Sequence, residues 1–202
     1  MKKYLALVIL FFAGLIVSAV NCHDYFTWIL EVVPGIIGFL ILLLTFKRFT
    51  FTYLTYVFIL VHCYILFIGG HYTYAKVPLF DWIREVLHQS RNNYDKVGHF
   101  FQGFVPAMIT RELFIRSDVF NKKGWIPFLT VCVCCTISMF YEFIEWFVSV
   151  TSGSSGDSFL GTQGDIWDTQ SDMLSATIGA VCMVLLLGKL QDKQIAKIKK
   201  AA

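Results

Sequence analysis

Six long runs of apolar residues constrain the fold of this chain more than any other feature. A bilayer core about 30 Å thick takes roughly 20 apolar residues of helix to cross, and each run is close to that length. Backbone groups exposed to lipid must be paired within their own segment, so each run is expected to be helical. The runs extend from Tyr4 to Val20, Trp28 to Phe46, Phe51 to Tyr72, Val97 to Ile115, Trp125 to Val150 and Asp172 to Leu190.

The composition excludes the other fold classes. Hydrophobic residues make up 56% of the 202 residues and charged residues only 15%, which is too apolar for the surface of a soluble globule. The apolar runs show no heptads, so a coiled coil is excluded as well. We predict an all-α polytopic membrane protein in which residues 1–202 form a single integral membrane domain. This domain is a bundle of six transmembrane helices with a short interfacial helix.

The distribution of Lys and Arg predicts the orientation, because cytoplasmic loops carry the excess of both. With the N-terminus inside, 13 of the 17 basic residues fall in cytoplasmic segments. The other four, Lys76, Arg84, Arg91 and Lys96, lie in one outer segment. Both termini are therefore expected to face the cytoplasm. The net charge of +3 needs no nucleic-acid partner, since the cationic excess lies where insertion places it, and membrane lipids are the expected partners.

The first span and one outer segment leave alternatives open, and a second outer loop has a distinct composition. Lys2 and Lys3 before an apolar run ending at Val17-Ser18-Ala19 fit either a retained first span or a cleaved signal peptide; the length of the run favours retention. Between Thr73 and Tyr94, an apolar face predicts a helix lying in the membrane interface, either as a simple cap or as a lid over a site. The Gly/Ser-rich loop from 151 to 157 is expected to be flexible.

Ionisable residues from spans far apart in the sequence are expected at one depth, near the outer leaflet. Such residues are costly in lipid and usually face protein or a wet cavity, which makes them the first candidates for function. The residues at this level are Glu31, His71, Asp95, His99, Glu142, Glu145, Asp165, Asp168 and Asp172.

Helical spacing groups these residues further. Asp95, His99 and Gln102 lie at i, i+4 and i+7 and share one helix face, and Glu142 and Glu145 lie at i and i+3. Asp165, Asp168 and Asp172 repeat the first pattern if their helix begins that early. Facing lipid would be costly, so each group is expected to point into the bundle.

Carboxylates and an imidazole at one point fit several kinds of chemistry. They suit a divalent cation such as Mg²⁺, Mn²⁺ or Zn²⁺. They also suit a metal-free hydrolytic centre, with one carboxylate as base and His99 as acid or proton carrier, or a relay for protons or ions. A network that only fixes helix packing is the structural alternative. The sequence does not choose between an enzyme and a non-enzymatic protein.

The leading hypothesis is a metal-assisted hydrolase or transferase acting on an envelope lipid or its headgroup. The alternative is a non-enzymatic transporter or lipid-binding membrane protein. In the leading hypothesis Lys96 or Arg91 helps to hold an anion, and the cofactor is a divalent metal of unassigned identity. The candidate catalytic residues are His99, Glu142, Glu145 and Asp168. The candidate metal ligands are His99, Glu142, Asp165, Asp168 and Asp172.

Three segments resemble the YjdF family of bacterial inner-membrane proteins. They are Tyr94-Asp-Lys-Val-Gly-His-Phe-Phe-Gln-Gly-Phe104, Tyr141-Glu-Phe-Ile-Glu-Trp146 and Gly161-Thr-Gln-Gly-Asp-Ile-Trp-Asp-Thr-Gln-Ser-Asp-Met173. The resemblance covers essentially the whole chain. It implies a multi-pass protein of the bacterial inner (cytoplasmic) membrane, and it implies no particular reaction.

The chain also has a weaker resemblance to VanZ-like proteins, which carry an Asp-Lys-x-x-His motif at the start of a span. That motif is matched here by Asp95, Lys96 and His99, followed by a later Glu and by an Asp before a helix containing Gly179. The match departs after the Glu, where Trp146 and the Gly/Ser loop replace the expected Gln and Arg.

Overall fold

The computed structural model describes residues 2–152, 159 and 162–201, and these residues form helices and connecting turns without a strand. The predicted all-α class is confirmed. Most of the Gly/Ser-rich loop predicted to be flexible lies outside the described residues. The helices are α1 (Lys2–Ala19), α2 (Tyr25–Thr45), α3 (Tyr53–Tyr72), α4 (Pro78–Val86), α5 (Tyr94–Arg116), η1 (Lys123–Trp125), α6 (Ile126–Ser152), α8 (Asp168–Cys182), the π-helical turn η2 (Met183–Leu187) and α9 (Gly188–Ala201).

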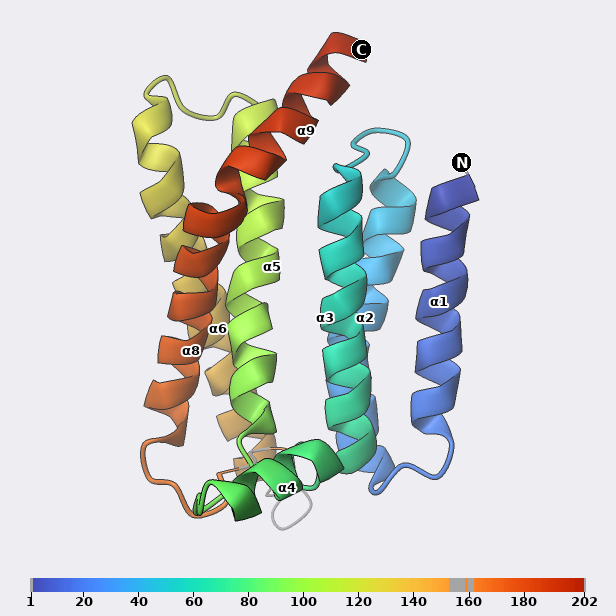
Figure 1. Ribbon diagram of the computed structural model, residues 1–202, viewed down its shortest axis with the longest axis vertical. Helices are drawn as coiled ribbons and strands as arrows, with labels where there is room; N and C mark the ends of the chain where they lie inside the picture. The colour runs from blue at the N-terminus through green and yellow to red at the C-terminus, as the bar shows by residue number, and fades with distance from the viewer. Residues whose placement is uncertain (1, 153–158, 160–161, 202) are drawn as a thin grey trace.

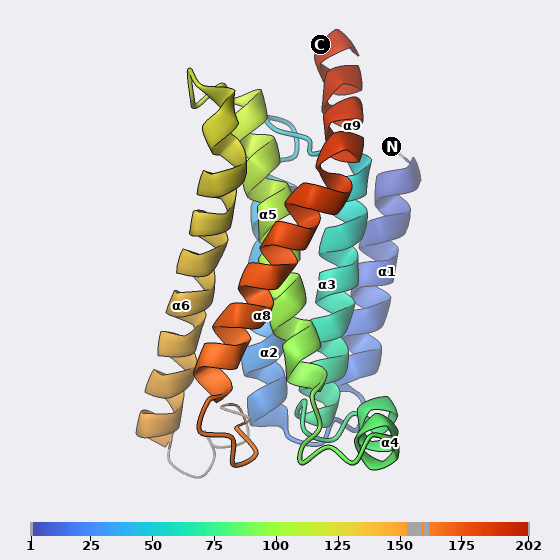
Figure 2. The ribbon, with the colours of Figure 1, turned by 60° about the vertical axis from the view of Figure 1, so that its left-hand side comes forward.

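Five of the described helices are long and apolar enough to cross a membrane. They are α1, α2, α3, the segment Lys123–Ser152 that contains α6, and the segment Asp168–Lys199 that contains α8. The remaining expected span lies in α5, which has 23 residues but carries charged side chains near both ends. Figures 1 and 2 show α5 running along α3, α6 and α8. Because α5 is surrounded by these helices, its polar residues contact protein rather than lipid.

The two ends of the bundle differ. Figure 1 shows both chain termini at one end, which we call the terminal end, and α4 lying across the opposite end, which we call the α4 end. No residue of α4 is buried, and Leu79 and Trp82 are 61% and 60% exposed. Exposed apolar side chains such as these are favourable where a helix lies in the membrane interface. The exposure of α4 therefore agrees with the predicted interfacial helix.

Local capping explains where two of the spans begin. Asp24 precedes α2, and its carboxylate accepts hydrogen bonds from the Thr27 hydroxyl at 2.6 Å and the Thr27 amide at 2.8 Å. These bonds hold the pKa of the Asp24 carboxyl below its usual range because they stabilise the charged form. Thr52 caps α3 in the same way, accepting from the amide of Thr55.

A polar network joins three helices at the terminal end. Glu112 of α5 is fully buried, and its carboxylate accepts from the Thr52 amide at 2.8 Å, the Thr55 hydroxyl at 2.9 Å and Arg116 at 3.0 Å. Nearby, the Arg111 guanidinium contacts Asp192 of α9 at 2.8 Å. These contacts connect α5 to the start of α3 and to α9, so they fix the helices that carry the polar residues of the α4 end.

The backbones of α5 and α8 touch. A Cβ atom added to Gly103 of α5 would lie 1.7 Å from the carbonyl oxygen of Ala176, and one added to Gly179 of α8 would lie 1.9 Å from the carbonyl oxygen of Phe100. Small residues allow this close approach in membrane bundles. His99 lies one turn from Gly103, and Asp172 lies one turn from Ala176, so the contact brings both side chains to the same gap between the helices.

We expect Gly103→Ala to lower the free energy of unfolding by about 3 kcal/mol or more, because the new methyl group has no space against a backbone carbonyl. Gly38→Ala is the matched control, since a Cβ at Gly38 meets nothing within 4 Å and alanine is the better helix former. Unfolding of the purified protein in detergent, followed by circular dichroism, measures both. Equal stability of the two variants would contradict the close contact.

Candidate functional site

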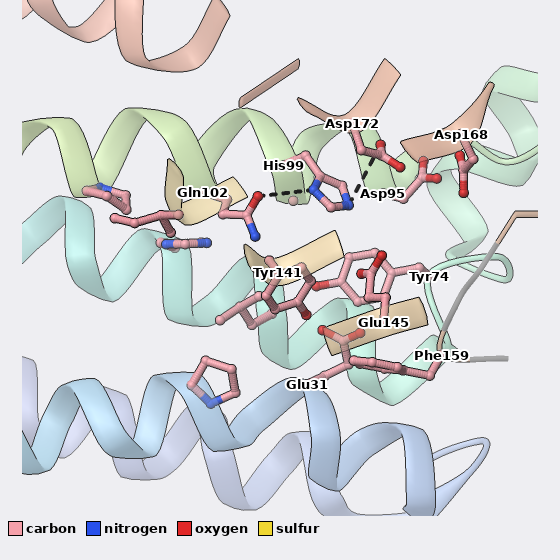
Figure 3. A pocket seen from close by; sticks show the side chains of 16 residues that line it. Glu31, Tyr74, Asp95, His99, Gln102, Tyr141, Glu145, Phe159, Asp168 and Asp172 are labelled. Atoms are coloured by element: carbon pink, nitrogen blue, oxygen red, sulfur yellow. Dashed lines mark hydrogen bonds and ion pairs between the residues drawn. The ribbon is translucent and has the colours of Figure 1, made fainter. Parts of the chain in front are cut away.

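A cavity of about 230 Å³ lies between α2, α3, α5, α6 and α8, toward the α4 end. Carboxylates and aromatic side chains from separate parts of the chain line it, among them Glu31, Tyr74, His99, Tyr141, Glu145 and Asp172. Figure 3 shows these side chains converging from their helices. No residue of α4 is among those that line the cavity.

The first of two acidic groups consists of three aspartates with two basic partners. Asp95, Asp168 and Asp172 are all buried, and each offers one oxygen within 4.8 Å of the others. The Lys96 ammonium lies 2.8 Å from Asp168 and 2.8 Å from Asp172. Arg91 donates to both Asp95 and Asp168. These pairs largely neutralise the three carboxylates, so we call this group the aspartate cluster.

Arg91 lies in the loop before α5 and is buried. Burial by itself lowers the pKa of its guanidinium, but the neighbouring Asp95 and Asp168 outweigh that effect and hold the pKa above its ordinary value. The reason is that an opposite charge nearby stabilises the charged form. Arg91 therefore remains a cation, and it ties the loop before α5 to the start of α8.

The second group consists of His99, Glu142 and Glu145, and we call it the histidine–glutamate group. All three residues are buried, and each offers one ligand atom within 4.8 Å of the others. The Nδ1 atom of His99 lies 3.7 Å from Oε1 of Glu142 and 3.1 Å from Oε1 of Gln102. Its Nε2 atom lies 3.7 Å from Oδ1 of Asp172, so the imidazole stands between the two acidic groups.

The two groups differ in how their charge is balanced. Among the described residues, no Lys or Arg forms an ion pair with Glu142, Glu145 or Glu31. Oε1 of Glu142 and Oε2 of Glu31 are buried and have no hydrogen-bond partner in the described structure. Buried carboxylates of this kind are costly unless a cation, a proton or a donor compensates them. The histidine–glutamate group is therefore a set of buried carboxylates that either a bound cation or a proton would compensate.

Glu31 was expected at this depth from the sequence, whereas Tyr74 was not a candidate, and both line the cavity. Glu31 enters from α2, and the hydroxyls of Tyr74 and Tyr141 are its hydrogen-bonding neighbours. Tyr74 follows α3 in a left-handed conformation with φ of 53°, and its amide donates to the carbonyl of Gly69 at 2.8 Å. Its ring lies against Gly69, where a Cβ would come within 2.2 Å of the ring. Only glycine leaves room for this ring.

The remaining sequence candidates lie in different places. Asp165 precedes the first turn of α8, its side chain is 34% exposed, and its nearest basic partner is Arg91 at 3.5 Å. It belongs to neither close group of ligand atoms. Nδ1 of His71 lies 2.9 Å from the carbonyl oxygen of Ser18, so this residue fastens α3 to the end of α1. His62, which the spacing patterns left aside, lines the cavity.

The bundle of apolar helices around a buried polar cavity defines a polytopic, all-α membrane protein. The chain belongs to the family described as predicted membrane protein (DUF2238), whose model matches residues 3–193. It is 46% identical over 183 residues to the inner membrane protein YjdF of Escherichia coli (strain K12), and the match covers 91% of this chain and 88% of that protein. No solved structure matches the chain.

These comparisons confirm the resemblance to YjdF that the three sequence segments carried. Together with the apolar helices, they identify a multi-pass protein of the bacterial inner membrane. Neither the family description nor the name of the relative specifies a reaction, so the chemistry of the site has to be argued from its residues.

We expect Lys96→Met to lower the free energy of unfolding by about 3–5 kcal/mol, because it leaves the buried Asp172 carboxylate without its Lys partner. Adding Asp172→Asn should recover part of that loss by removing the uncompensated charge, whereas Asp168 keeps its pair with Arg91. Arg84→Met is the control, since Arg84 forms a partly exposed pair with Asp81 at 3.4 Å and such pairs contribute about 0–1 kcal/mol. A Lys96→Met variant as stable as Arg84→Met would refute the aspartate cluster.

Proposed function

We propose that this protein is a metal-assisted hydrolase or transferase that acts on an envelope lipid or its headgroup. The reacting centre is the histidine–glutamate group, and the aspartate cluster supports it from α8. The α4 end faces the periplasm and both termini face the cytoplasm. The excess of Lys and Arg in the segments at the terminal end supports this orientation.

A single observation carries the proposal: Glu142 and Glu145 lie beside His99 and have no Lys or Arg partner among the described residues. Oxygen and imidazole nitrogen are the donors that Zn²⁺ and Mn²⁺ take in proteins. A divalent cation would compensate both carboxylates and occupy the free oxygen of Glu142. Cys residues do not belong to the group, and sites with oxygen and nitrogen donors suit hydrolytic rather than structural zinc.

The spacing of the donors is compatible with coordination. Ligand atoms about 2 Å from a common ion lie roughly 3–4 Å from one another, and His99 Nδ1 is 3.7 Å from Glu142 Oε1. With Nδ1 on the ion, the Nε2–H group would face Asp172 at 3.7 Å. A carboxylate that holds the second nitrogen of a liganding histidine fixes the tautomer and the ring. Asp172 is therefore assigned the role of orienting His99.

We divide the sequence candidates between two roles. His99, Glu142 and Glu145 are assigned as metal ligands. A side chain that acts as acid or base in the reaction must lie close to the bound ion. Asp168 is assigned a structural role, because Lys96 and Arg91 both contact it. The same contacts engage Lys96 and Arg91, so neither is free to act as the principal binder of an anionic group.

The reaction proposed is hydrolysis or group transfer at an ester of the lipid headgroup. In hydrolysis the water oxygen forms a bond to the phosphorus or acyl carbon, the bond to the leaving oxygen breaks, and a proton passes from water to that oxygen. A divalent ion would polarise the ester and lower the pKa of bound water. The cavity of about 230 Å³ has the size of a headgroup rather than a whole lipid, so acyl chains would remain in the membrane.

A lipid-binding protein without catalytic activity is the second candidate. A second cavity of about 260 Å³ lies between α1, α2 and α3. Most of its lining side chains are apolar, and Lys47 also lines it. Such a groove fits an acyl chain near a basic residue. This candidate predicts that the lipid leaves the protein unchanged, which a product assay distinguishes from the leading proposal.

We expect the purified protein to bind about one equivalent of Mn²⁺ or Zn²⁺, and His99→Ala or Glu142→Gln to abolish that binding under the same conditions. Asp172→Asn should weaken it by about 10–100-fold, because it removes a partner of the liganding histidine. Isothermal titration with each metal, after treatment with a chelator, measures the affinities. His23→Ala is the control, since His23 is exposed and contacts Lys76 instead of the cavity.

Two results would contradict this assignment. One is metal binding that persists unchanged in folded His99→Ala protein, which would show that the metal site lies elsewhere in the protein. The other is a metal-loaded wild type that binds phospholipid in nanodiscs and releases no product, which would favour the lipid-binding candidate.

A further inference from the structure

The part of the cavity around Glu31 differs chemically from the histidine–glutamate group. Glu31 is 4% exposed, it lines the cavity, and Oε2 of its carboxylate has no hydrogen-bond partner in the described structure. Tyr74 and Tyr141 stand beside it and interact with the same carboxylate. Figure 3 shows the Glu31 carboxyl group directed toward these two tyrosines and Glu145. The arrangement leaves a buried acceptor open toward the cavity.

We propose that Glu31, Tyr74 and Tyr141 form a binding site for a primary ammonium group. An ammonium ion has three N–H donors and no acceptor. The free oxygen of Glu31 accepts one of them, and the hydroxyl oxygens of the tyrosines offer further lone pairs. The positive charge compensates the Glu31 carboxylate, for which no described Lys or Arg provides an ion pair.

The aromatic surroundings strengthen this choice of ligand. Tyr141 lies 6.4 Å from the ring of Phe159 between centroids, and both residues line the cavity with Tyr74. Aromatic rings attract cations most strongly where water is excluded. A quaternary ammonium would also satisfy the rings, but it has no N–H group and would leave the Glu31 oxygen without a donor. The site is therefore selective for a primary over a quaternary ammonium.

The ammonium site identifies a substrate class for the reaction proposed above, and this part of the inference rests on that proposed function. Glu145 belongs to the histidine–glutamate group and lies close enough to Glu31 for their charges to interact. In an ethanolamine phospholipid, two carbons separate the ammonium from the phosphoester. An ammonium held at Glu31 would place that phosphoester beside the histidine–glutamate group, so the substrate is a lipid with an ethanolamine headgroup.

Backbone geometry explains how the site is held ready. Thr73 and Tyr74 both have φ of 53°, a left-handed conformation that is unfavourable for residues other than glycine. Packing of the Tyr74 ring between Gly69 and Gly98 offsets this cost, with a Cβ at Gly98 falling 3.0 Å from the ring. A Cβ atom added to Gly70 would similarly lie 3.1 Å from the Cβ of Glu31. The glycines of α3 thus bring both side chains into the cavity.

Headgroup binding tests the proposal on the full-length protein in detergent. The probes are the short-chain lipids dihexanoyl phosphatidylethanolamine and dihexanoyl phosphatidylcholine, with free ethanolamine as a third ligand. Isothermal titration should give an affinity for the ethanolamine lipid at least about tenfold above that for the choline lipid, the factor expected from one hydrogen bond to a charged group. Equal affinity for the two lipids would overturn the proposal.

Substitutions localise the effect. Glu31→Gln should remove the headgroup preference while leaving metal binding intact, and His99→Ala should do the reverse, so failure of this inference is distinguishable from failure of the metal proposal. Tyr141→Phe, which deletes only a hydroxyl, should reduce the preference and serves as the test if Glu31→Gln does not fold. Tyr64→Phe is the matched control, since its hydroxyl bonds to the Leu10 carbonyl at 2.8 Å, away from the site.

Two further results are decisive. A headgroup preference that survives in both Glu31→Gln and Tyr141→Phe would overturn the site. Free ethanolamine binding as tightly as its lipid would retain the ammonium site and overturn the assignment to a lipid headgroup.

Discussion

The contact between α5 and α8 is the interaction on which the rest of the site depends. Gly103 lets the backbone of α5 touch that of α8 at Ala176, and the side chains one turn away from these two residues are His99 and Asp172. A wider separation would place the imidazole and its partner on different sides of a gap. Close packing through small residues is a main source of helix association where lipid provides no hydrophobic driving force. One local constraint thus sets both the stability of the bundle and the geometry of its polar centre.

The bundle also balances charge unevenly, and this imbalance gives the site its chemical character. Arg91 and Lys96 neutralise the aspartate cluster, whereas Glu31, Glu142 and Glu145 have no Lys or Arg partner among the described residues. Buried carboxylates in a membrane usually mark function. The cavity therefore contains two regions whose side chains suit a cation. One is the histidine–glutamate group on α5 and α6, and the other is Glu31 on α2 with the aromatic ring of Tyr74 after α3.

Much of this arrangement could be predicted from the sequence, because the relevant signals are local. The apolar runs predicted the all-α membrane class. The helical spacing of Asp95 and His99, and of Glu142 and Glu145, predicted that each pair points into the bundle. The division into two groups could not be predicted, since it depends on where Arg91 folds back. Asp165 falls outside the helix because α8 begins at Asp168. Tyr74 enters through a left-handed turn that no periodicity reveals.

The coordination of a bound ion tests the central claim most directly. In protein loaded with Mn²⁺ and labelled with ¹⁵N-histidine, pulsed electron paramagnetic resonance resolves nitrogen bound to the metal. The account predicts coupling to a single histidine nitrogen, which disappears in folded His99→Gln protein and persists in His62→Gln. Coupling that persists in His99→Gln, or a wild-type spectrum of the fully hydrated ion, would contradict a metal centre at the histidine–glutamate group.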